Sequence, residues 1–164
     1  MKKIQTLFII IVLAIIGAYI LQNTKYLEDF KKTNDLRRKS DLKTLQTALE
    51  NYYQNHGRYP KSSQKNPLFR IVRLDDSVAD WGQQWIPYLT VLPKDPSEAK
   101  NYIYYSDLEA GQSYYIYASL DNSTDKELCF YKNGVKDYKC RNVPSNASCG
   151  GVCNYGLSSA NVNP

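Results

Sequence analysis

The chain opens with an apolar run that leads without a break into a long charged segment. Residues 7–21 read LFIIIVLAIIGAYIL, and charged side chains are frequent in residues 22–57. Because no proline occurs before Pro60, nothing in this stretch forbids one helix through about His56. At 1.5 Å per residue such a helix is roughly 75–80 Å long, too long for the interior of a compact domain. The sequence therefore predicts a helix that begins in a membrane and ends against a folded domain.

The apolar run has the length and the flanking residues of a membrane anchor. From Ile4 to Leu21 only Gln5 and Thr6 are polar, and two lysines precede the run. Large residues stand where a secretory peptidase needs small ones, so we expect the anchor to be retained. The residues expected to form the membrane and assembly helix are Leu7, Phe8, Ile9, Ile10, Ile11, Val12, Leu13, Ile15, Ile16, Ile20 and Leu21.

The cysteines indicate on which side of the membrane the rest of the chain lies. Cys129, Cys140, Cys149 and Cys153 are an even number in a region rich in Gly, Asn and Ser, a pattern typical of disulfides outside the cytoplasm. Zinc is the less favoured alternative, because no CxxC pair occurs and the only histidine, His56, is far away. Lysines and arginines after the apolar run favour the opposite orientation. We give the cysteines more weight and expect an extracytoplasmic C-terminal region.

The second half of the predicted helix carries an apolar stripe. Apolar side chains recur at steps of three and four residues, which places them along one face. The members of this stripe are Leu36, Leu42, Leu45, Ala48, Leu49, Tyr52 and Tyr53. We expect Leu42, Leu45, Leu49 and Tyr52 to pack on a sheet.

The helix segment before this stripe is less apolar. Between residues 22 and 35 only Tyr26, Leu27 and Phe30 stand among charges of both signs. This composition indicates either a solvated stalk or a surface that meets other subunits. Gly57 is a typical C-terminal stop for the whole helix.

A loop-rich region over residues 61–96 separates the helix from the sheet. Within it, residues 77–89 predict a short helix in which Trp81 and Trp85 share a face. Anchoring of the loop by these two tryptophans is favoured over an aromatic platform for a ligand.

The C-terminal part predicts an antiparallel sheet over the helix stripe, hence an α+β fold. Strands are expected at residues 102–105, 113–120, 128–131 and 135–140. The last two are joined by Asn133-Gly134, a strong two-residue hairpin signal. This turn makes Cys129–Cys140 the preferred first disulfide among the three connectivities that four cysteines allow.

Four features occur in a fixed order along the chain: a short basic tail before an apolar helix, the helix end LKTLQTALENYYQNHGRYP, the segment WIPYLTVLPKDP, and a tyrosine-rich sheet before a cysteine-bearing end. Together they resemble the type IV pilin family, especially the major pseudopilins of type II secretion systems. The resemblance implies a non-enzymatic subunit of a pilus-like or pseudopilus-like fibre, assembled with copies of itself or related pilin-like subunits. It implies a cytoplasmic tail over 1–6, an assembly helix over 7–21, its continuation over 22–57 and an extracytoplasmic region over 58–164.

The start of the chain departs from the family pattern. The family's precursors carry a glycine just before the apolar helix and a glutamate five positions into the mature chain. Residues 1–6 contain no glycine, and the first acidic residue is Glu28. We therefore expect a single-pass membrane protein that keeps its N-terminal residues.

The resemblance also implies a candidate calcium site. Many pseudopilins hold calcium in a loop after the second strand, where Asp121 and Asp125 supply carboxylates here. The family's glycine-rich pattern is missing from this loop, so a solvated turn is favoured over calcium. No other cofactor and no small-molecule substrate is expected.

A second hypothesis for function is a membrane-tethered binding module. The net charge of +5 permits contact with DNA, through Arg37, Arg38 and Lys39, and the pair Trp81 and Trp85 could meet a glycan. The fibre subunit is favoured over this binding module.

Overall fold

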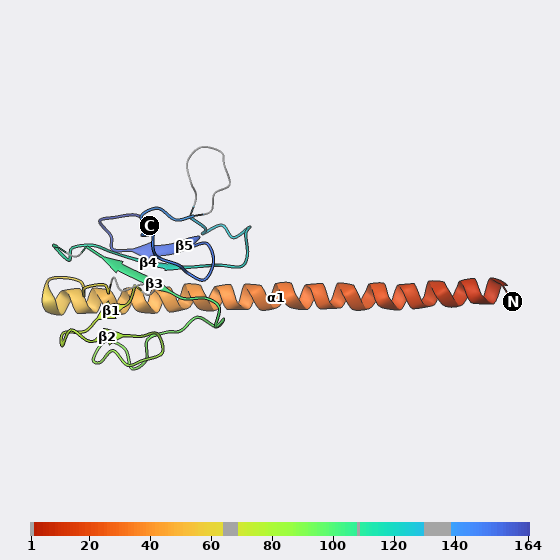
Figure 1. Cartoon of the computed structure of the whole chain (residues 1–164), viewed down its shortest axis with the longest axis horizontal. Coiled ribbons are helices and arrows are strands. Elements are labelled where there is room, and N and C mark those ends of the chain that lie inside the picture. Colours follow the sequence, from red (N-terminus) through yellow and green to blue (C-terminus); the bar gives the residue numbers. More distant parts are fainter. Residues whose placement is uncertain (1, 64–68, 108, 130–138) are drawn as a thin grey trace. The chain divides into compact units, whose positions relative to one another are not determined.

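The computed structural model describes residues 2–63, 69–107, 109–129 and 139–164. Its elements are α1 (Lys2–His56), β1 (Ile71–Val72), β2 (Val78–Ala79), β3 (Ile103–Ser106), β4 (Tyr114–Ala118) and β5 (Tyr155–Ser158), and the strands gather along the C-terminal part of α1 (Figure 1). This α+β architecture confirms the fold class predicted from the sequence. The helix ends where it was expected, because Gly57 takes a φ of 67° and its N–H bonds the carbonyl of Tyr53.

The chain divides into two units, Met1–Asn34 and Asp35–Pro164. The first unit is helical, and its described apolar side chains are exposed, from Val12 at 37% to Leu21 at 72%. By length and composition its helix is able to cross a membrane. The side chains of Leu7 and Phe8 lie outside the described part of the chain.

The second unit contains a three-stranded antiparallel sheet in the order β3-β4-β5. β3 and β4 confirm the strands expected near residues 102–105 and 113–120. The strands expected at residues 128–131 and 135–140 are not found at their described residues 128, 129, 139 and 140, and the rest of both lies outside the described residues. The third strand of the sheet is instead β5, which is paired with β4. The Asn133-Gly134 turn lies outside the described residues.

The pairing of β5 with β4 requires a residue without a side chain at one position. Gly156 lies opposite Tyr117 in the ladder, and a Cβ on Gly156 would come within 2.7 Å of the Tyr117 ring. Only glycine fits beneath that ring. Glycine is rarely favoured inside a strand, so the sequence pattern did not indicate a strand here.

The short helix predicted over residues 77–89 is wrong. Val78–Ala79 instead pairs with β1, and the following residues form turns, one of which exchanges backbone bonds between Trp85 and Leu89. Gly82 takes a φ of 89°, which is incompatible with a right-handed helix, and Pro87 has no N–H to donate.

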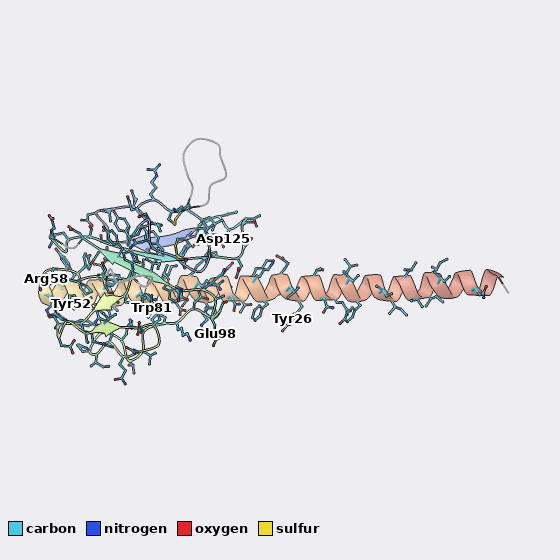
Figure 2. The ribbon with its side chains drawn as sticks, viewed as in Figure 1. Tyr26, Tyr52, Arg58, Trp81, Glu98 and Asp125 are labelled. Carbon is cyan, nitrogen blue, oxygen red and sulfur yellow. A yellow bond between two sulfur atoms is a disulfide. The ribbon has the colours of Figure 1, made fainter. Side chains whose placement is uncertain are left out.

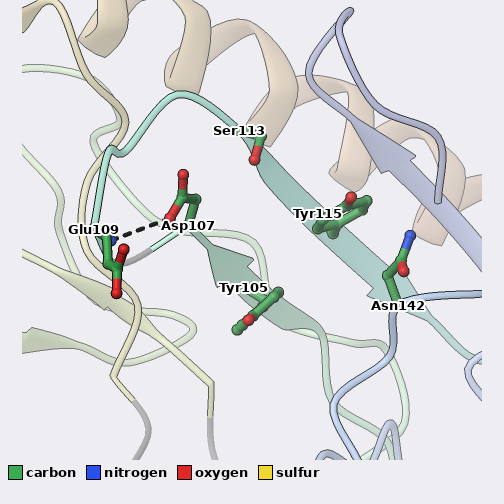
Figure 3. A pocket seen from close by; sticks show the side chains of 6 residues that line it. All are labelled: Tyr105, Asp107, Glu109, Ser113, Tyr115 and Asn142. Atoms are coloured by element: carbon green, nitrogen blue, oxygen red, sulfur yellow. Dashed lines mark hydrogen bonds between the residues drawn. The ribbon is translucent and has the colours of Figure 1, made fainter.

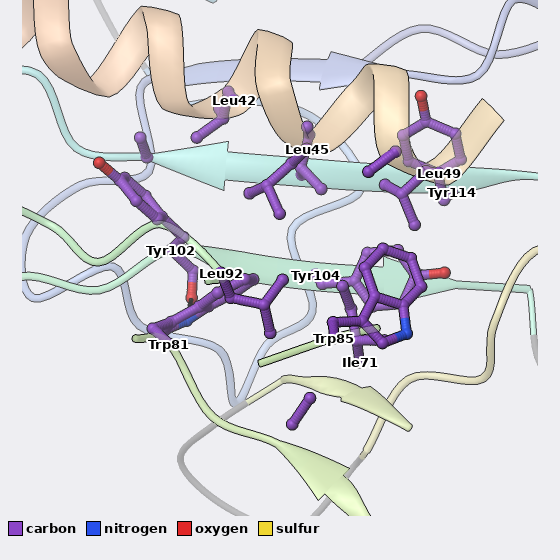
Figure 4. Close-up of a cluster of buried hydrophobic side chains, with 14 of the residues drawn as sticks. Leu42, Leu45, Leu49, Ile71, Trp81, Trp85, Leu92, Tyr102, Tyr104 and Tyr114 are labelled. Atoms are coloured by element: carbon purple, nitrogen blue, oxygen red, sulfur yellow. Dashed lines mark hydrogen bonds between the residues drawn. The ribbon is translucent and has the colours of Figure 1, made fainter. Parts of the chain in front are cut away.

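The main core lies between the helix stripe, the sheet and the tryptophan-bearing loop (Figure 4). Leu42, Leu45, Leu49 and Tyr52 are buried, as expected. Trp81 and Trp85 are buried too, which confirms that they anchor the loop. Other members of the core are Ile71, Leu92, Tyr102, Tyr104, Tyr114 and Ile116.

Leu36 was wrongly placed in this stripe. It is 67% exposed, because it precedes Leu45 by nine residues, about two and a half turns, and so lies on the opposite side of the helix. The domain is therefore packed on one face of α1 and leaves an apolar residue on the other.

The outer face of the sheet is covered by the cysteine-bearing segment. Tyr117 and Ile103 form a second cluster with Cys140, Cys149 and Cys153. The disulfides join Cys129 to Cys140 and Cys149 to Cys153. The first is the pair that the sequence favoured, and each disulfide closes a short loop within the segment that covers this face.

Leu49→Ala should lower the free energy of unfolding by about 2–4 kcal/mol, because it removes buried methyl groups and leaves a cavity in the main core. The measurement is urea unfolding of the full chain in detergent micelles, followed by the fluorescence of the buried Trp81 and Trp85. Leu36→Ala is the matched control and should change the value by less than about 0.5 kcal/mol. Equal effects of the two substitutions would contradict the packing described here.

Candidate functional site

A buried charged cluster joins α1 to two loops of the second unit. The Arg38 side chain is fully buried, and its Nε and Nη2 donate to both carboxylate oxygens of Asp95, at 2.9 and 3.0 Å. Its Nη1 donates to Asp35 and to Asp121, each at 2.8 Å. One guanidinium thus holds together three carboxylates, and its planar fork matches the bidentate partner Asp95.

The cluster also binds the backbone of the loop that follows β4. The carboxylate of Asp35 accepts hydrogen bonds from the backbone N–H groups of Asp121 and Asn122, at 2.9 and 2.8 Å. Asp95 similarly accepts from the N–H of Ser97 at 2.8 Å. Both loops are therefore attached to the helix through side chains that Arg38 neutralises.

The electrostatics of the cluster favour its charged forms. Burial lowers the pKa of Arg38, but hydrogen bonds to Asp95 and Asp121 outweigh burial and raise it above its ordinary value. Burial raises the pKa of Asp121, but hydrogen bonds from Lys100 and Arg38 outweigh burial and hold it below the usual range. Opposite charges at hydrogen-bond distance thus compensate for the loss of water.

A second set of ion pairs lies next to the first. Lys39 Nζ donates to both oxygens of Asp125, at 2.7 and 2.8 Å, and lies 3.3 Å from Glu127. Asp125 is labelled beside the sheet in Figure 2. Lys100 Nζ donates to Asp121 at 2.6 Å. The two carboxylates proposed for calcium therefore each have cationic partners.

A calcium site, which the sequence left as the less favoured alternative to a solvated turn, does not fit this geometry. Within the described ranges of the chain, no three side chains of His, Cys, Asp or Glu are grouped to hold a metal ion. Asp121 and Asp125 belong instead to ion pairs with Arg38, Lys39 and Lys100.

The contacts proposed for a DNA or glycan module are not available either. Arg38 and the Trp81 and Trp85 rings are buried, and Lys39 is paired with Asp125. Of the three basic residues proposed for DNA only Arg37 remains exposed, at 61%, and its Nε lies 3.9 Å from the carboxylate of Asp41. The sequence could have shown the burial of Arg38, since it stands four residues before Leu42 and so continues the stripe.

Three tyrosine hydroxyl groups donate hydrogen bonds to carboxylates of α1 that follow the cluster along the helix. Tyr102 Oη donates to Asp41 at 2.7 Å, and the hydroxyls of Tyr59 and Tyr114 donate to Glu50 at 2.9 and 3.0 Å. Sequence reasoning did not assign these pairs. Their signal in the sequence is a carboxylate at the edge of the helix stripe combined with an unusual number of tyrosines, 15, in the chain.

An open depression of about 580 Å³ lies at the other end of the sheet. Figure 3 shows its lining of Tyr105, Asp107, Glu109, Ser113, Tyr115 and Asn142. The Asp107 carboxylate accepts from the backbone N–H of Glu109 at 3.1 Å, so it shapes the turn between β3 and β4. The lining includes no cysteine or histidine.

Arg38→Met should lower the free energy of unfolding by about 3–5 kcal/mol, because it leaves the buried Asp35 and Asp95 without a cation. Arg38→Lys should recover only part of this loss, since an ammonium cannot make the bidentate contact. Urea unfolding in detergent micelles measures both. A stable Arg38→Met protein would show that the cluster does not hold the loops.

Acid should destabilise the protein through Asp121 and Asp125. Both have lowered pKa values in the folded state, so their contribution is present above the unfolded pKa, about 3.9, and is lost as pH falls below it. Unfolding measured from neutral pH downwards should show stability falling below about pH 4. In Asp125→Asn the fall should be shallower and the stability at neutral pH lower. Identical pH profiles of the two proteins would contradict this assignment.

Comparison with known proteins agrees with the helix, sheet and loops described above. The family model described as type II secretion system (T2SS), protein G, matches residues 25–127, more than half of the 164 residues. No curated protein and no solved structure is similar enough to match the chain. The chain belongs to the type II secretion system protein G family, the major pseudopilins, and is thus a non-enzymatic structural subunit that assembles with other pilin subunits into a pseudopilus.

Proposed function

We propose that this pseudopilin assembles with copies of itself through the apolar part of α1. The observation that carries the proposal is the exposure of this segment, in which apolar side chains such as Leu13 (62%) and Ile15 (64%) have no partner among the described residues. Exposed apolar side chains in such number favour burial in lipid or against other subunits. The family match begins at residue 25, so the support for this role is the apolar chemistry of the segment itself.

Before assembly, residues 7–21 hold the subunit in the membrane, with the second unit on the extracytoplasmic side. The two disulfides support that side, because disulfides persist in oxidising compartments. On assembly the same residues leave the lipid and fill the interior of the fibre, and the sheet-bearing unit forms its surface. Lipid and fibre interior are both apolar, so the same apolar side chains suit the subunit before and after assembly.

Contacts between copies extend beyond the membrane segment of the helix. Tyr26, Leu27 and Phe30 are between 55% and 69% exposed, and Leu36 is 67% exposed. Tyr26 is labelled on its stretch of helix in Figure 2. These residues support the second of the two interpretations of this segment, a surface that meets other subunits. Leu36 is the most informative of them, because it lies on the face of α1 that faces away from the core of its own unit.

Leu36→Asp should reduce assembly and leave the fold unchanged, because a carboxylate would replace an apolar contact between copies. The measurement is the yield of crosslinked oligomers from membranes of producing cells, together with the melting temperature (Tm) of the purified chain. Leu74→Asp is the matched control, since Leu74 is equally exposed, at 65%, but lies in a loop. Loss of oligomers only in the helix variant supports the proposal. Equal oligomer yields from both variants would overturn the contact at Leu36.

A further inference from the structure

The loop between Ser119 and Leu128 follows β4 and contains three carboxylates within seven residues. Leu120 and Leu128 are buried in the main core at its two ends. The polar part between them must be held by something other than apolar packing. We infer that cationic side chains of the chain itself, Arg38, Lys39 and Lys100, hold this loop on α1, so that the subunit folds and remains stable without calcium.

Lys39 holds the second half of the loop. Its side chain is 14% exposed and its ammonium group lies between Asp125, which is 17% exposed, and Glu127. The Asp125 carboxylate that it neutralises also accepts the backbone N–H of Glu127 at 2.9 Å. The ammonium is thus placed where the loop turns, and it contacts both of the acidic residues there.

Lys100 and Arg38 hold the first half. Lys100 Nζ contacts one oxygen of Asp121 and the carbonyl oxygen of Ser119, at 2.6 and 3.0 Å, and Arg38 contacts the other oxygen of Asp121. The carboxylate of Asp35 also accepts hydrogen bonds from the backbone N–H groups of Asp121 and Asn122 in the loop. All three carboxylates of the loop therefore have a cationic partner from outside the loop.

The donor set does not fit calcium. A calcium ion takes six to eight oxygen ligands that converge on one point, and carboxylates supply its charge balance. Here Asp121 and Asp125 are directed to separate cations, and the ammonium of Lys39 lies between the two acidic side chains that could otherwise share an ion. A divalent cation in this place would be repelled by Lys39 at short range. The positive charge that a metal ion would supply comes here from the side chains of Arg38, Lys39 and Lys100.

The pKa shifts of Lys39 and Asp125 favour the charged form of both side chains, as an ion pair requires. Burial lowers the pKa of Lys39, but hydrogen bonds to Asp125 and Glu127 outweigh burial and raise it. Burial raises the pKa of Asp125, but the hydrogen bond from Lys39 outweighs burial and lowers it. Each partner thus favours the charged form of the other.

The test is the melting of the full chain in detergent micelles, by circular dichroism, with calcium chloride or with a chelator, alongside calorimetric titration with calcium chloride. We expect the same Tm in both solutions and no heat of calcium binding. A Tm that rises with calcium, or a saturable heat of binding, would overturn the inference. This result does not depend on fibre assembly, so it is separate from the proposal for Leu36.

Variants test the role of Lys39 directly. Lys39→Met keeps the length of the side chain and removes its charge, and it should lower Tm by about 2–6 °C. Lys39→Arg should restore most of the loss. Lys43→Met is the matched control, because Lys43 lies one turn later on the exposed face and has no ion pair among the described residues; its Tm should not change. If the Lys39→Met and Lys43→Met proteins both have the Tm of the wild-type protein, Lys39 does not hold the loop.

Discussion

The burial of one face of α1 is the interaction on which the rest of the folded unit depends. Leu42, Leu45 and Leu49 are fully buried, and they contact a sheet, a loop and two tryptophans that come from distant parts of the chain. The three-stranded sheet is too small to be stable by itself. The helix supplies the apolar surface against which one face of the sheet packs, and the disulfide-linked end of the chain covers the other face.

Apolar packing alone does not determine how the loops attach to the helix. Burying Arg38 among three carboxylates is costly unless every donor and acceptor finds its partner, and here the guanidinium is bonded on three sides. Such a cluster permits little displacement of the loops, because any shift would leave a buried charge without its partner. The cluster therefore contributes specificity of position more than stability, and Lys39 and Lys100 extend it to the loop after β4.

The two halves of the helix show how one element serves both folding and assembly. On the half that belongs to the folded unit, apolar side chains are buried within the chain, apart from Leu36. On the first half they are exposed throughout the described residues. A structural subunit of a pseudopilus needs this division, since the surfaces that join subunits must remain available after the subunit itself has folded. The family membership and the distribution of exposed apolar residues are thus consistent with each other.

The sequence by itself determined the long helix, its apolar first part, the stripe at Leu42 and Leu49, two of the strands and the favoured disulfide. These depend on local periodicity, on the absence of proline before Pro60 and on the turn signal between Cys129 and Cys140, all of which are visible along the chain. Only the tertiary structure decided that β5 completes the sheet, that residues 77–89 form a strand and turns, and which carboxylates surround Arg38. Two of the three carboxylate partners of Arg38, Asp95 and Asp121, lie 57 and 83 residues away, and Gly156 is selected by a ring on another strand. Local patterns cannot specify such contacts, because the residues that stabilise them meet only after the chain has folded.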